Sequence, residues 1–559
     1  ILVGGEAGQG LVTIGESMVR AMTRAGYEIV VTQDYMSRIR GGHNTFAIRT
    51  GPDPALAPTE DIDILVALNQ ETVDLHLPRL SSRGVLVAGD DLAVPAGTSC
   101  LRVPFRKLAA KPLYDNVAAL GVLGSAICGD LAILERLVSE TFAKKGREVI
   151  EANLAVLRAA YAWVKEQDFA FTCMPPAPEG NAGRLMLNGN EAIALGALAA
   201  GCDFVSFYPM TPGTSVVLTL IDKGRETGLV AEQAEDEIAA VNMALGAAHA
   251  GARAMVSTSG GGFALMCEGV SLAGMLELPV VLVIAQRPGP ATGLPTRTEQ
   301  ADLNLALYAG HGEFPRAIFA PGSVEDCFYL THRAFDLAER YQSPCFVLTD
   351  QFLADSFRSV APFDLEALPE PPRPLLAPED PRSYKRYALT EDGVSPRVVP
   401  GFSEALVIAD SDEHTEDGKL TEDLGVRVAM QDKRLRKGLG LIEETVPPDY
   451  YGPDAPDLLL VCWGSTLGAA LEARQTLEER GEKASVLHFR QVWPLDGRQF
   501  LPFLEAAQQV VAVEGNSTGQ LAALLRQETG VLLDSLILRY DGLPFTARFI
   551  LDGLDKLSS

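Results

Sequence analysis

The sequence YPMTPGTS at residues 208–215 directly follows the strand-like run Asp203–Phe207. A second segment, QRPGPATGLPT at residues 286–296, directly follows the apolar run Val280–Ala285. Short apolar runs bounded by Pro and Gly are typical of buried strands, and ligands bind at the carboxyl ends of strands in parallel α/β sheets. We therefore predict an α/β fold with a binding site at the edge where the two segments meet.

Arg287 is the charged residue of this predicted edge, and Thr211 and Thr296 add hydroxyl groups. A guanidinium grips a small carboxylate with two hydrogen bonds, and nearby hydroxyls can add to them. An arginine at the end of a strand is otherwise most often part of a surface ion pair. The sequence alone leaves both interpretations open.

Strand-like and helix-like segments alternate along most of the chain, as in α/β proteins. We expect helices over residues 11–25, 149–166, 191–200, 232–250 and 263–277, and strands that include 62–67, 84–88, 253–257 and 484–489. Pro-rich or charged stretches separate three such regions. We predict α/β domains at residues 1–172, 184–381 and 456–559, a linker at 173–183, and an irregular connecting segment at 382–455. A chain of 559 residues has room for three domains.

The formal net charge is -26 and the mean hydropathy is only +0.11. An acidic chain disfavours binding to nucleic acid or to anionic membranes, because both need basic protein surface. No apolar run approaches the ~18 residues of a membrane helix. The first residues, ILVGG, are typical of a strand rather than of a signal peptide. We therefore predict a cytoplasmic protein without a nucleic-acid or membrane partner.

The eight cysteines are spread along the chain and form no CxxC motif. Iron–sulfur clusters and structural zinc sites usually need clustered cysteines. We therefore expect no metal ligands in this chain. Most of the cysteines stand in apolar runs and are expected to be buried thiols, which fits a reducing compartment.

Two further features stand at the starts of predicted helices. Glu237 precedes the Ala- and Gly-rich segment 238–250, which suits close burial, and a buried carboxylate needs a specific partner. Acidic residues at a helix start are otherwise usually solvated and favoured by the helix dipole. The loop Thr258–Gly262 ends in three glycines, which either let the backbone approach a flat ring closely or form a simple flexible turn.

The N-terminal region has its own glycine-rich loop, GGEAGQG at residues 4–10, between a predicted strand and a predicted helix. Free N–H groups at such a helix start can bind a phosphate, although a tight turn without a ligand has the same composition. The loop lacks the G-x-G-x-x-G spacing of a dinucleotide site. The segment SRIRGGHN follows at residues 37–44.

GGEAGQG and SRIRGGHN together resemble the γ chain of 2-oxoacid:ferredoxin oxidoreductases. The rest of the chain resembles the α chain of that family in YPMTP, in the Thr258–Gly262 loop, and in GLPTRTEQAD at residues 293–302. The resemblance implies a γ-like domain, a domain similar to the pyrimidine-binding domain for thiamine diphosphate, and a domain similar to the transketolase C-terminal domain. In the last domain, Gly464–Thr466 and Glu514–Asn516 are expected to serve structure and subunit contacts.

The resemblance also implies roles for the candidate residues. Arg287 and Thr211 would bind the carboxylate of a 2-oxoacid, with Thr296 on the substrate side. Glu237 would activate thiamine diphosphate through a hydrogen bond to its aminopyrimidine ring. Further contacts to this cofactor are expected from Thr258, Ser259 and Gly260, and contacts to coenzyme A from Gly8, Gln9 and Gly10.

One half of a thiamine site is missing from the sequence. Thiamine enzymes hold the diphosphate and Mg²⁺ with a GDG motif, and GDG occurs nowhere in this chain. The resemblance therefore implies a β subunit that supplies the diphosphate site, Mg²⁺ and a [4Fe–4S] cluster. The expected partners are this β subunit and ferredoxin, in an (αβ)₂ hetero-oligomer.

From this resemblance we predict a fused γ–α subunit of a CoA-dependent, ferredoxin-linked oxidative decarboxylase of 2-oxoacids. The expected substrate is 2-oxoglutarate, which would give succinyl-CoA and CO₂ in a reversible reaction that fixes CO₂ in reverse, as in a reverse TCA cycle. Pyruvate or a broad range of 2-oxoacids is the alternative substrate. A cluster-free, transketolase-like enzyme and a non-catalytic scaffold subunit are alternatives of other classes. The missing GDG weighs against the first of these, and the combination of Thr211, Glu237 and Arg287 weighs against the second.

Overall fold

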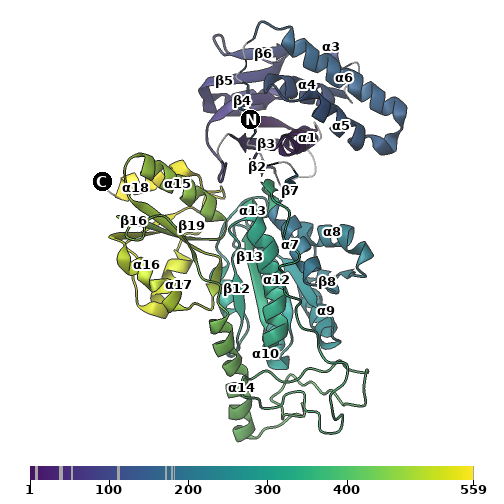
Figure 1. Cartoon of the computed structure of the whole chain (residues 1–559), viewed down its shortest axis with the longest axis vertical. Helices are drawn as coiled ribbons and strands as arrows, with labels where there is room; N and C mark the ends of the chain where they lie inside the picture. The colour runs from purple at the N-terminus through teal and green to yellow at the C-terminus, as the bar shows by residue number, and fades with distance from the viewer. Residues whose placement is uncertain are drawn as a thin grey trace. The chain divides into compact units, whose positions relative to one another are not determined.

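The computed structural model describes residues 1–6, 10–36, 42–51, 54–109, 114–169, 171, 173–177, 181 and 183–557. The chain divides into two compact units, and Figure 1 colours it from the N-terminus to the C-terminus. The first unit comprises residues 1–187 and 356–363, and the second comprises residues 188–355 and 364–559.

The first unit contains an eight-stranded mixed sheet with the order β6-β5-β4-β1-β3-β2-β14-β7. Its strands are β1 (Leu2–Glu6), β2 (Ile29–Asp34), β3 (His43–Thr50), β4 (Ile62–Ala67), β5 (Leu80–Gly89), β6 (Cys100–Val103), β7 (Leu185–Leu187) and β14 (Arg358–Val360). Its helices are α1 (Leu11–Arg24), α2 (Gln70–His76), α3 (Phe105–Leu108), α4 (Asp115–Ala126), α5 (Leu131–Thr141) and α6 (Arg147–Lys165). β1 runs parallel to β4 and antiparallel to β3.

The core of this unit depends on close helix packing. α1 is amphipathic and buries Ile14, Met18 and Val19. A side chain at Gly15 would lie 2.3 Å from the ring of Phe46 on β3, so the absence of a Cβ lets α1 approach the sheet. α4 is apolar on all sides and packs against α1, α5 and α6, as expected of a fully buried helix.

The second unit contains a seven-stranded sheet with the order β18-β12-β13-β11-β10-β8-β9. The strands are β8 (Phe204–Phe207), β9 (Val230–Gln233), β10 (Ala254–Thr258), β11 (Val280–Gln286), β12 (Ala317–Phe319), β13 (Pro344–Asp350) and β18 (Gln491–Trp493). All neighbouring pairs are parallel except β12 and β18.

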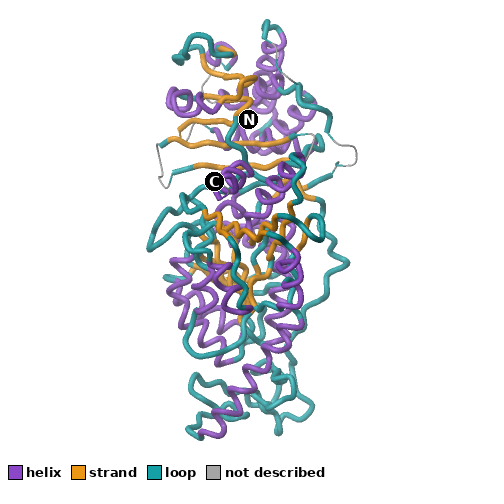
Figure 2. Tube along the Cα trace, turned by 90° about the vertical axis from the view of Figure 1, so that its left-hand side faces the viewer, coloured by secondary structure: helices purple, strands orange, loops and turns teal. Residues whose placement is uncertain are grey.

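Helices cover both faces of this sheet, and in Figure 2 the orange strands of the unit lie between purple helices. α7 packs against α8 and α12, whereas α9 packs against α10. The helices are α7 (Gly189–Ala199), α8 (Thr214–Lys223), α9 (Glu237–His249), α10 (Gly260–Leu276), α11 (Leu303–Tyr308), α12 (Val324–Tyr341) and α13 (Gln351–Asp355).

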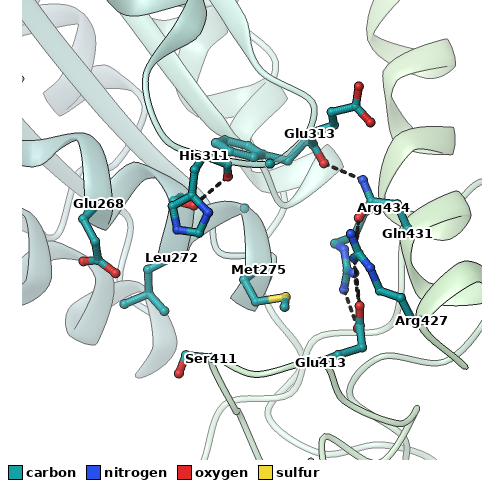
Figure 3. Close-up of a pocket in the computed structure, with 14 residues that line it drawn as sticks. Glu268, Leu272, Met275, His311, Glu313, Ser411, Glu413, Arg427, Gln431 and Arg434 are labelled. Atoms are coloured by element: carbon teal, nitrogen blue, oxygen red, sulfur yellow. Dashed lines mark hydrogen bonds and ion pairs between the residues drawn. The ribbon is translucent and has the colours of Figure 1, made fainter. Parts of the chain in front are cut away.

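A long helix, α14 (Leu424–Glu443), and the loops before it complete this part of the second unit (Figure 1). Lys433 and Lys437 of α14 are fully buried and both bind the carboxylate of Glu277, at 2.7 Å each. Arg427 and Arg434 of the same helix both bind Glu413, as Figure 3 shows. Buried ion pairs to Glu277 therefore join α14 to the sheet domain, and the pairs to Glu413 join it to the loop that precedes it.

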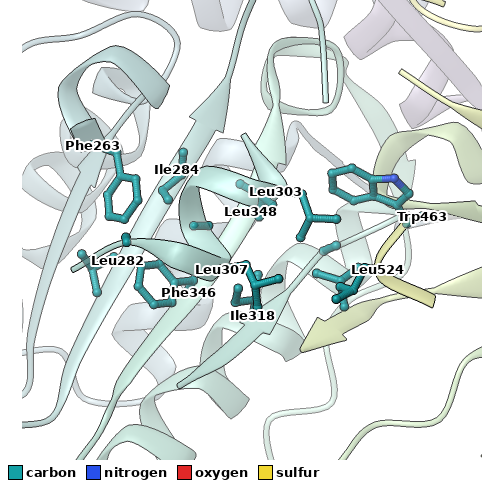
Figure 4. Packing of buried hydrophobic residues seen from close by; sticks show 14 of the residues in the cluster. Phe263, Leu282, Ile284, Leu303, Leu307, Ile318, Phe346, Leu348, Trp463 and Leu524 are labelled. Carbon is teal, nitrogen blue, oxygen red and sulfur yellow. The ribbon is translucent and has the colours of Figure 1, made fainter. Parts of the chain in front are cut away.

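The third sheet has the order β15-β17-β16-β19-β20. Its strands are β15 (Asp449–Tyr451), β16 (Leu458–Trp463), β17 (Ala484–Phe489), β19 (Gln509–Glu514) and β20 (Ser535–Leu538), and its helices are α15 (Leu467–Glu479), α16 (Leu501–Ala506), α17 (Gln520–Thr529) and α18 (Ala547–Leu557). One hydrophobic cluster runs from Phe263 and Phe346 in the seven-stranded domain to Trp463 and Leu524 here (Figure 4). The two domains of the second unit therefore share a core.

The predicted α/β class with three such regions is confirmed, and the exact domain limits stay a prediction. Two helix predictions are wrong. The helix expected at 232–250 begins only at Glu237, because Glu232 and Gln233 belong to β9. Gly260–Gly262 are the first turn of α10 and not a loop. The connecting segment 382–455 is not irregular throughout, since it contains α14.

One expectation about the cysteines is also wrong. Cys128 and Cys173 form a disulfide, with 5.2 Å between their Cα atoms, and are not free thiols. The free cysteines Cys202, Cys327, Cys345 and Cys462 are buried as expected. In the described residues no group of three or more side chains could hold a metal ion, and no helix there is long and apolar enough to cross a bilayer.

Candidate active site

The predicted site residues Thr211, Thr258 and Arg287 lie at the carboxyl ends of three neighbouring parallel strands, β8, β10 and β11. β8 leads into the loop 208–213, which carries Thr211. β10 leads directly into α10. β11 leads into the loop 287–302, which carries Arg287 and Thr296, and Glu237 begins α9 on the side of β8.

Arg287 and Thr211 are in direct contact. Nη1 of Arg287 donates a hydrogen bond of 2.6 Å to the Thr211 carbonyl. The loop that carries Thr211 is itself anchored, because the Asn190 amide donates to the Pro212 carbonyl and the Ser257 hydroxyl donates to the Gly213 carbonyl, both at 2.8 Å. The sheet edge thus fixes the half-buried guanidinium group.

Glu237 is buried, with 3% of its surface exposed, and its Oε1 has no hydrogen-bond partner among the described residues. Burial raises the pKa of its carboxyl group above the ordinary value. The helix start is capped by its neighbour, because the Asp236 side chain accepts from the N–H of Ala239 at 2.7 Å. Glu237 is therefore free to bind a ligand that donates a hydrogen bond.

The three glycines that begin α10 fit between two carboxyl groups. A Cβ on Gly262 would lie 2.6 Å from Oε1 of Glu237, and a Cβ on Gly260 would lie 2.2 Å from Oδ2 of Asp302. Gly261 has more space, with the Ala291 carbonyl at 3.4 Å from its Cβ position. Only glycines allow this helix start to lie against both acids.

Thr258 and Ser259 precede this helix start and are completely buried. The hydroxyl group of Ser259 has no hydrogen-bond partner in the part of the chain that the structure describes. The roles predicted for Thr258, Ser259 and Gly260 stay predictions, but all three lie at the edge that carries Glu237 and Arg287.

Asp302 is a site residue that the sequence reasoning missed. Burial raises the pKa of its carboxyl group from 3.8 to about 6, although the nearby Arg287 opposes the shift. Its Oδ2 is buried without a hydrogen-bond partner within the described residues. Its position at the end of GLPTRTEQAD, the most specific string in the chain, was the available signal.

The loop between Arg287 and Thr296 is tightly folded. The Leu294 N–H donates to the Pro288 carbonyl at 3.0 Å, and the Arg297 N–H donates to the Leu294 carbonyl at 3.1 Å. Gly293 has a φ of +53°, and a Cβ there would lie 1.7 Å from the Pro288 carbonyl oxygen. Thr296 lies on this loop, and its contact with a substrate stays a prediction.

In the first unit, Gly10 is the N-cap of α1, with a φ of 76°. A Cβ on Gly10 would overlap the Asn116 side chain, at 1.9 Å from its nitrogen. Gly8 and Gln9 lie outside the described residues, as do residues 37–41 of SRIRGGHN. Contacts of this loop with coenzyme A therefore stay a prediction.

A separate cavity of about 260 Å³ lies between α10, the loop at His311–Phe314, and α14 (Figure 3). Its arginines are already engaged with Glu413, and Gln431 donates from Nε2 to the Glu313 carbonyl at 2.7 Å. None of the described candidate site residues lines it. The cavity is therefore distinct from the sheet edge.

Three protein-family models match successive parts of this chain. They are pyruvate ferredoxin/flavodoxin oxidoreductase at residues 1–163, the thiamine diphosphate-binding domain of pyruvate flavodoxin/ferredoxin oxidoreductase at residues 195–433, and the transketolase C-terminal domain at residues 452–531. The α subunit of 2-oxoacid:ferredoxin oxidoreductase 2 from Aeropyrum pernix is 33% identical over 97% of this chain and 95% of its own length. The chain belongs to the 2-oxoacid:ferredoxin oxidoreductase family. It is an α subunit with a γ-like N-terminal domain, as predicted.

Two other members of the 2-oxoacid:ferredoxin oxidoreductase family have names that specify 2-oxoglutarate. The 2-oxoglutarate oxidoreductase subunit KorA of Mycobacterium tuberculosis is 29% identical over 97% of this chain and 89% of its own length. The solved structure of 2-oxoglutarate:ferredoxin oxidoreductase from Magnetococcus marinus, with 2-oxoglutarate, coenzyme A and succinyl-CoA bound, superimposes with a TM-score of 0.93 at 31% identity. This superposition covers 99% of this chain and 98% of that one.

The part of the chain that matches the family's thiamine diphosphate-binding domain contains the sheet edge described above. The match to the thiamine diphosphate-binding domain, residues 195–433, includes Thr211, Glu237, Arg287 and Asp302. As an α subunit, the chain is one component of a multi-subunit oxidoreductase. Among the described residues, Oε1 of Glu237 is buried without a hydrogen-bond partner beside the glycines that begin α10. This arrangement suits a flat ring that carries N–H groups, such as the pyrimidine ring of thiamine diphosphate.

Proposed function

We propose that this α subunit binds a 2-oxoacid and the pyrimidine half of thiamine diphosphate for CoA-dependent oxidative decarboxylation, with 2-oxoglutarate as the substrate. The overall reaction converts the 2-oxoacid, CoA and oxidised ferredoxin into acyl-CoA, CO₂ and reduced ferredoxin. The reverse direction fixes CO₂. The observation that carries the proposal is the meeting of Arg287, Thr211 and Glu237 at one sheet edge.

In this proposal Arg287 binds the C1 carboxylate of the substrate. The guanidinium group is half-buried and already oriented by its bond to the Thr211 carbonyl, so little side-chain freedom is lost on binding. The hydroxyl groups of Thr211 and Thr296 add hydrogen bonds to the same carboxylate or to the oxygen beside it.

In this proposal Glu237 binds the cofactor rather than the substrate. Thiamine diphosphate, when bound, supplies the carbanion and the electron sink for decarboxylation. Glu237 accepts a hydrogen bond at Oε1 from the pyrimidine ring and exchanges a proton there, which its raised pKa favours. Thr258, Ser259 and Gly260 line the same ring, and the glycines let it lie close to the backbone.

The other half of the site belongs to a partner subunit in this proposal. The absence of GDG from the sequence supports a β subunit that binds the diphosphate, Mg²⁺ and a [4Fe–4S] cluster and passes electrons to ferredoxin. We propose an (αβ)₂ hetero-oligomer as the assembly. Gly8, Gln9 and Gly10 are proposed to contact coenzyme A, since a loop before a helix binds phosphate groups well.

The choice of 2-oxoglutarate rests on the names of two relatives, the M. tuberculosis KorA subunit and the M. marinus enzyme. A dicarboxylate needs a second cation for its distal carboxylate, and we propose that the β subunit provides it. A broader range of 2-oxoacids is the second candidate, because the A. pernix relative at 33% identity is named for 2-oxoacids in general.

The direct test is turnover by the co-expressed complex of this chain and its partner subunit under anaerobic conditions. CoA-dependent reduction of a viologen dye would be measured with 2-oxoglutarate and with pyruvate. Turnover with 2-oxoglutarate alone supports the proposal as stated. Turnover with pyruvate keeps the reaction and changes the substrate. No turnover with any 2-oxoacid, in a complex without thiamine diphosphate, contradicts the proposal and favours a scaffold subunit.

A further inference from the structure

The loop that carries Arg287 and Thr296 is tied to the C-terminal domain by one buried amide, that of Gln300. Its Nε2 donates to the Trp463 carbonyl at 2.9 Å, and its Oε1 accepts from the Gly515 N–H at 2.8 Å. The side chain is 2% exposed. Both ends of the amide are therefore satisfied by the backbone of the C-terminal domain.

Main-chain bonds strengthen the same connection. The Gln300 N–H donates to the Gly515 carbonyl, and the Asn516 side chain donates to the Gln300 carbonyl at 3.2 Å. Asn516 is in turn held by the buried carboxylate of Glu514, at 2.9 Å. Gln300 therefore hydrogen-bonds to the C-terminal domain through its side-chain amide, its backbone N–H and its backbone carbonyl.

Two glycines of the C-terminal domain leave room for this amide. A Cβ on Gly464, which has a φ of +57°, would lie 2.7 Å from Nε2 of Gln300. A Cβ on Gly515 would lie 3.0 Å from its Oε1. The strand-end motifs Gly464–Thr466 and Glu514–Asn516 thus form the two walls of a slot for Gln300.

Residues on both sides of Gln300 also hydrogen-bond to the C-terminal domain. The Thr298 N–H donates to the Gly542 carbonyl of the C-terminal domain, while its hydroxyl donates at 3.1 Å to Asp350, the last residue of β13 in the sheet domain. Gln520 donates from Nε2 to the Ala301 carbonyl at 2.8 Å and accepts from the Asn304 N–H at 2.9 Å. Residues 298–304 are therefore held along their length by the C-terminal half of the unit.

The base of the loop is closed on the sheet domain. The Asp302 N–H donates to Oε1 of Gln286, the last residue of β11, at 2.9 Å. Residues 287–302 thus leave β11 and return to it, and Gln300 lies next to the point of return. A shift at Gln300 must move Asp302 and the loop before it.

We propose that Gln300 is a positioning residue, and that the C-terminal domain fixes the substrate-binding loop 287–302 through it. This inference rests on the proposed function of Arg287 and Thr296. It gives the C-terminal domain a part in substrate binding that requires no contact with the substrate. The geometry of a bound 2-oxoacid is sensitive to such positioning, because a displacement of about 1 Å can cost about a hundredfold in rate.

The test compares Gln300→Ala with Gln491→Ala in the complete complex. Gln491 is the matched control, since it is also 2% exposed and uses both ends of its amide, to the Val446 N–H and the Trp493 carbonyl. We expect Gln300→Ala to raise the KM for the 2-oxoacid about tenfold or more, with the KM for CoA unchanged. Gln491→Ala should lower thermal stability to a similar extent and change neither KM.

Amide hydrogen exchange gives a second readout that does not depend on turnover. Exchange in residues 287–299 should become faster in Gln300→Ala and stay unchanged in Gln491→Ala. If Gln300→Ala fails to assemble, Gln520→Ala tests the same connection at a less buried position and should show both effects. If the wild-type complex shows no turnover, the proposed function is contradicted. The comparison of hydrogen exchange in the two variants then still decides whether Gln300 positions the loop. Unchanged exchange and KM in Gln300→Ala, or equal effects in Gln491→Ala, would overturn the inference.

Discussion

At the scale of single residues, the site is built from charged groups that the sheet edge holds close together. Arg287 and Thr211 come from the ends of two strands with one strand between them, and a hydrogen bond joins them. Glu237 and Asp302 lie against two glycines of one helix start. One cation and two partly desolvated acids thus surround the start of α10.

Replacement of Arg287 tests the carboxylate-binding role. We expect Arg287→Ala to raise the KM for the 2-oxoacid about 10- to 100-fold, the range for a lost hydrogen bond to a charged group. The KM for CoA should not change. Arg225, an exposed arginine on the same unit, is the matched control, and Arg225→Ala should leave both constants unchanged. An unchanged KM for the 2-oxoacid in Arg287→Ala would rule out its assigned role.

Replacement of Glu237 tests the cofactor-activating role. Glu237→Gln preserves the shape of the side chain but removes its ability to exchange a proton. We expect kcat to fall about 100-fold or more, with thiamine diphosphate still bound to the complex. The exposed neighbour Glu235 provides the control, since Glu235→Gln should retain full activity. Normal kcat in Glu237→Gln would remove Glu237 from the chemistry.

The raised pKa of the Asp302 carboxyl group predicts that the stability of the protein depends on pH. Because folding raises its pKa from 3.8 to about 6, its contribution to stability is full below about pH 4 and is lost as the pH rises through 6. Arg287 and Glu299 are the charged groups that face it. Asp302→Asn removes the charge and should stabilise the protein by about 3 kcal/mol at pH 7.5. Thermal denaturation at pH 4 should show no difference from wild type, and equal shifts at both pH values would contradict this account.

The positions of Arg287, Thr211 and Glu237 at the sheet edge could be predicted from the sequence because each stands at a local signal, a strand end or a helix start, whereas their roles stay predictions. Asp302 could not be assigned in this way. Its burial depends on the missing side chain of Gly260, forty-two residues earlier in the numbering, and on the return of the loop to Gln286. Local sequence pattern carries no information about such a contact.

At the scale of elements, the sequence predicts the buried strands well, because a parallel strand is a continuous apolar run bounded by turn residues. β4 and β17 have the limits expected from the sequence. The sequence did not indicate α14 because its buried face includes Lys433 and Lys437, and lysines usually indicate a solvent-exposed surface. They are buried only because Glu277, 156 residues from Lys433 in sequence, lies opposite them.

The start of α10 offers a matched pair of substitutions. Gly262→Ala places a methyl group 2.2 Å from the Thr258 hydroxyl and 2.6 Å from Glu237, so we expect a loss of about 1–3 kcal/mol in stability. Gly261→Ala meets its nearest neighbour only at 3.4 Å and should change stability by less than about 0.5 kcal/mol. Chemical denaturation of the two variants under the same conditions compares their free energies of unfolding. Equal stability would show that the close approach at Gly262 is not needed.

The attachment of α14 predicts a large effect at Glu277. Glu277→Gln leaves two buried lysines without their anion, which should cost about 3–5 kcal/mol. The exposed pair Glu443 and Arg498 is the control, and Glu443→Gln should cost at most about 1 kcal/mol. Chemical denaturation of both variants measures the difference. A small effect at Glu277 would mean that other contacts hold α14.

At the scale of the whole molecule, one chain with three sheets combines a γ-like unit, a domain that matches the thiamine diphosphate-binding domain of the family, and a transketolase C-terminal domain. The domain types were implied by the resemblance of short motifs to a known family, and each of those motifs is local in sequence. The disulfide between Cys128 and Cys173 did not, because the two cysteines are 45 residues apart and only the fold brings them together. The slot for Gln300 escaped prediction for the same reason, since its walls lie more than 160 residues away in sequence.

The central claim is that this chain supplies the pyrimidine half of a thiamine site and its partner subunit supplies the diphosphate half. The most direct measurement is the content of tightly bound thiamine diphosphate in this chain alone, in the partner alone, and in the co-expressed complex. We predict about one cofactor for each copy of this chain in the wild-type complex, and none that survives gel filtration on this chain alone. A complex that turns over 2-oxoacids without thiamine diphosphate, or this chain alone retaining a full complement of it, would contradict the account.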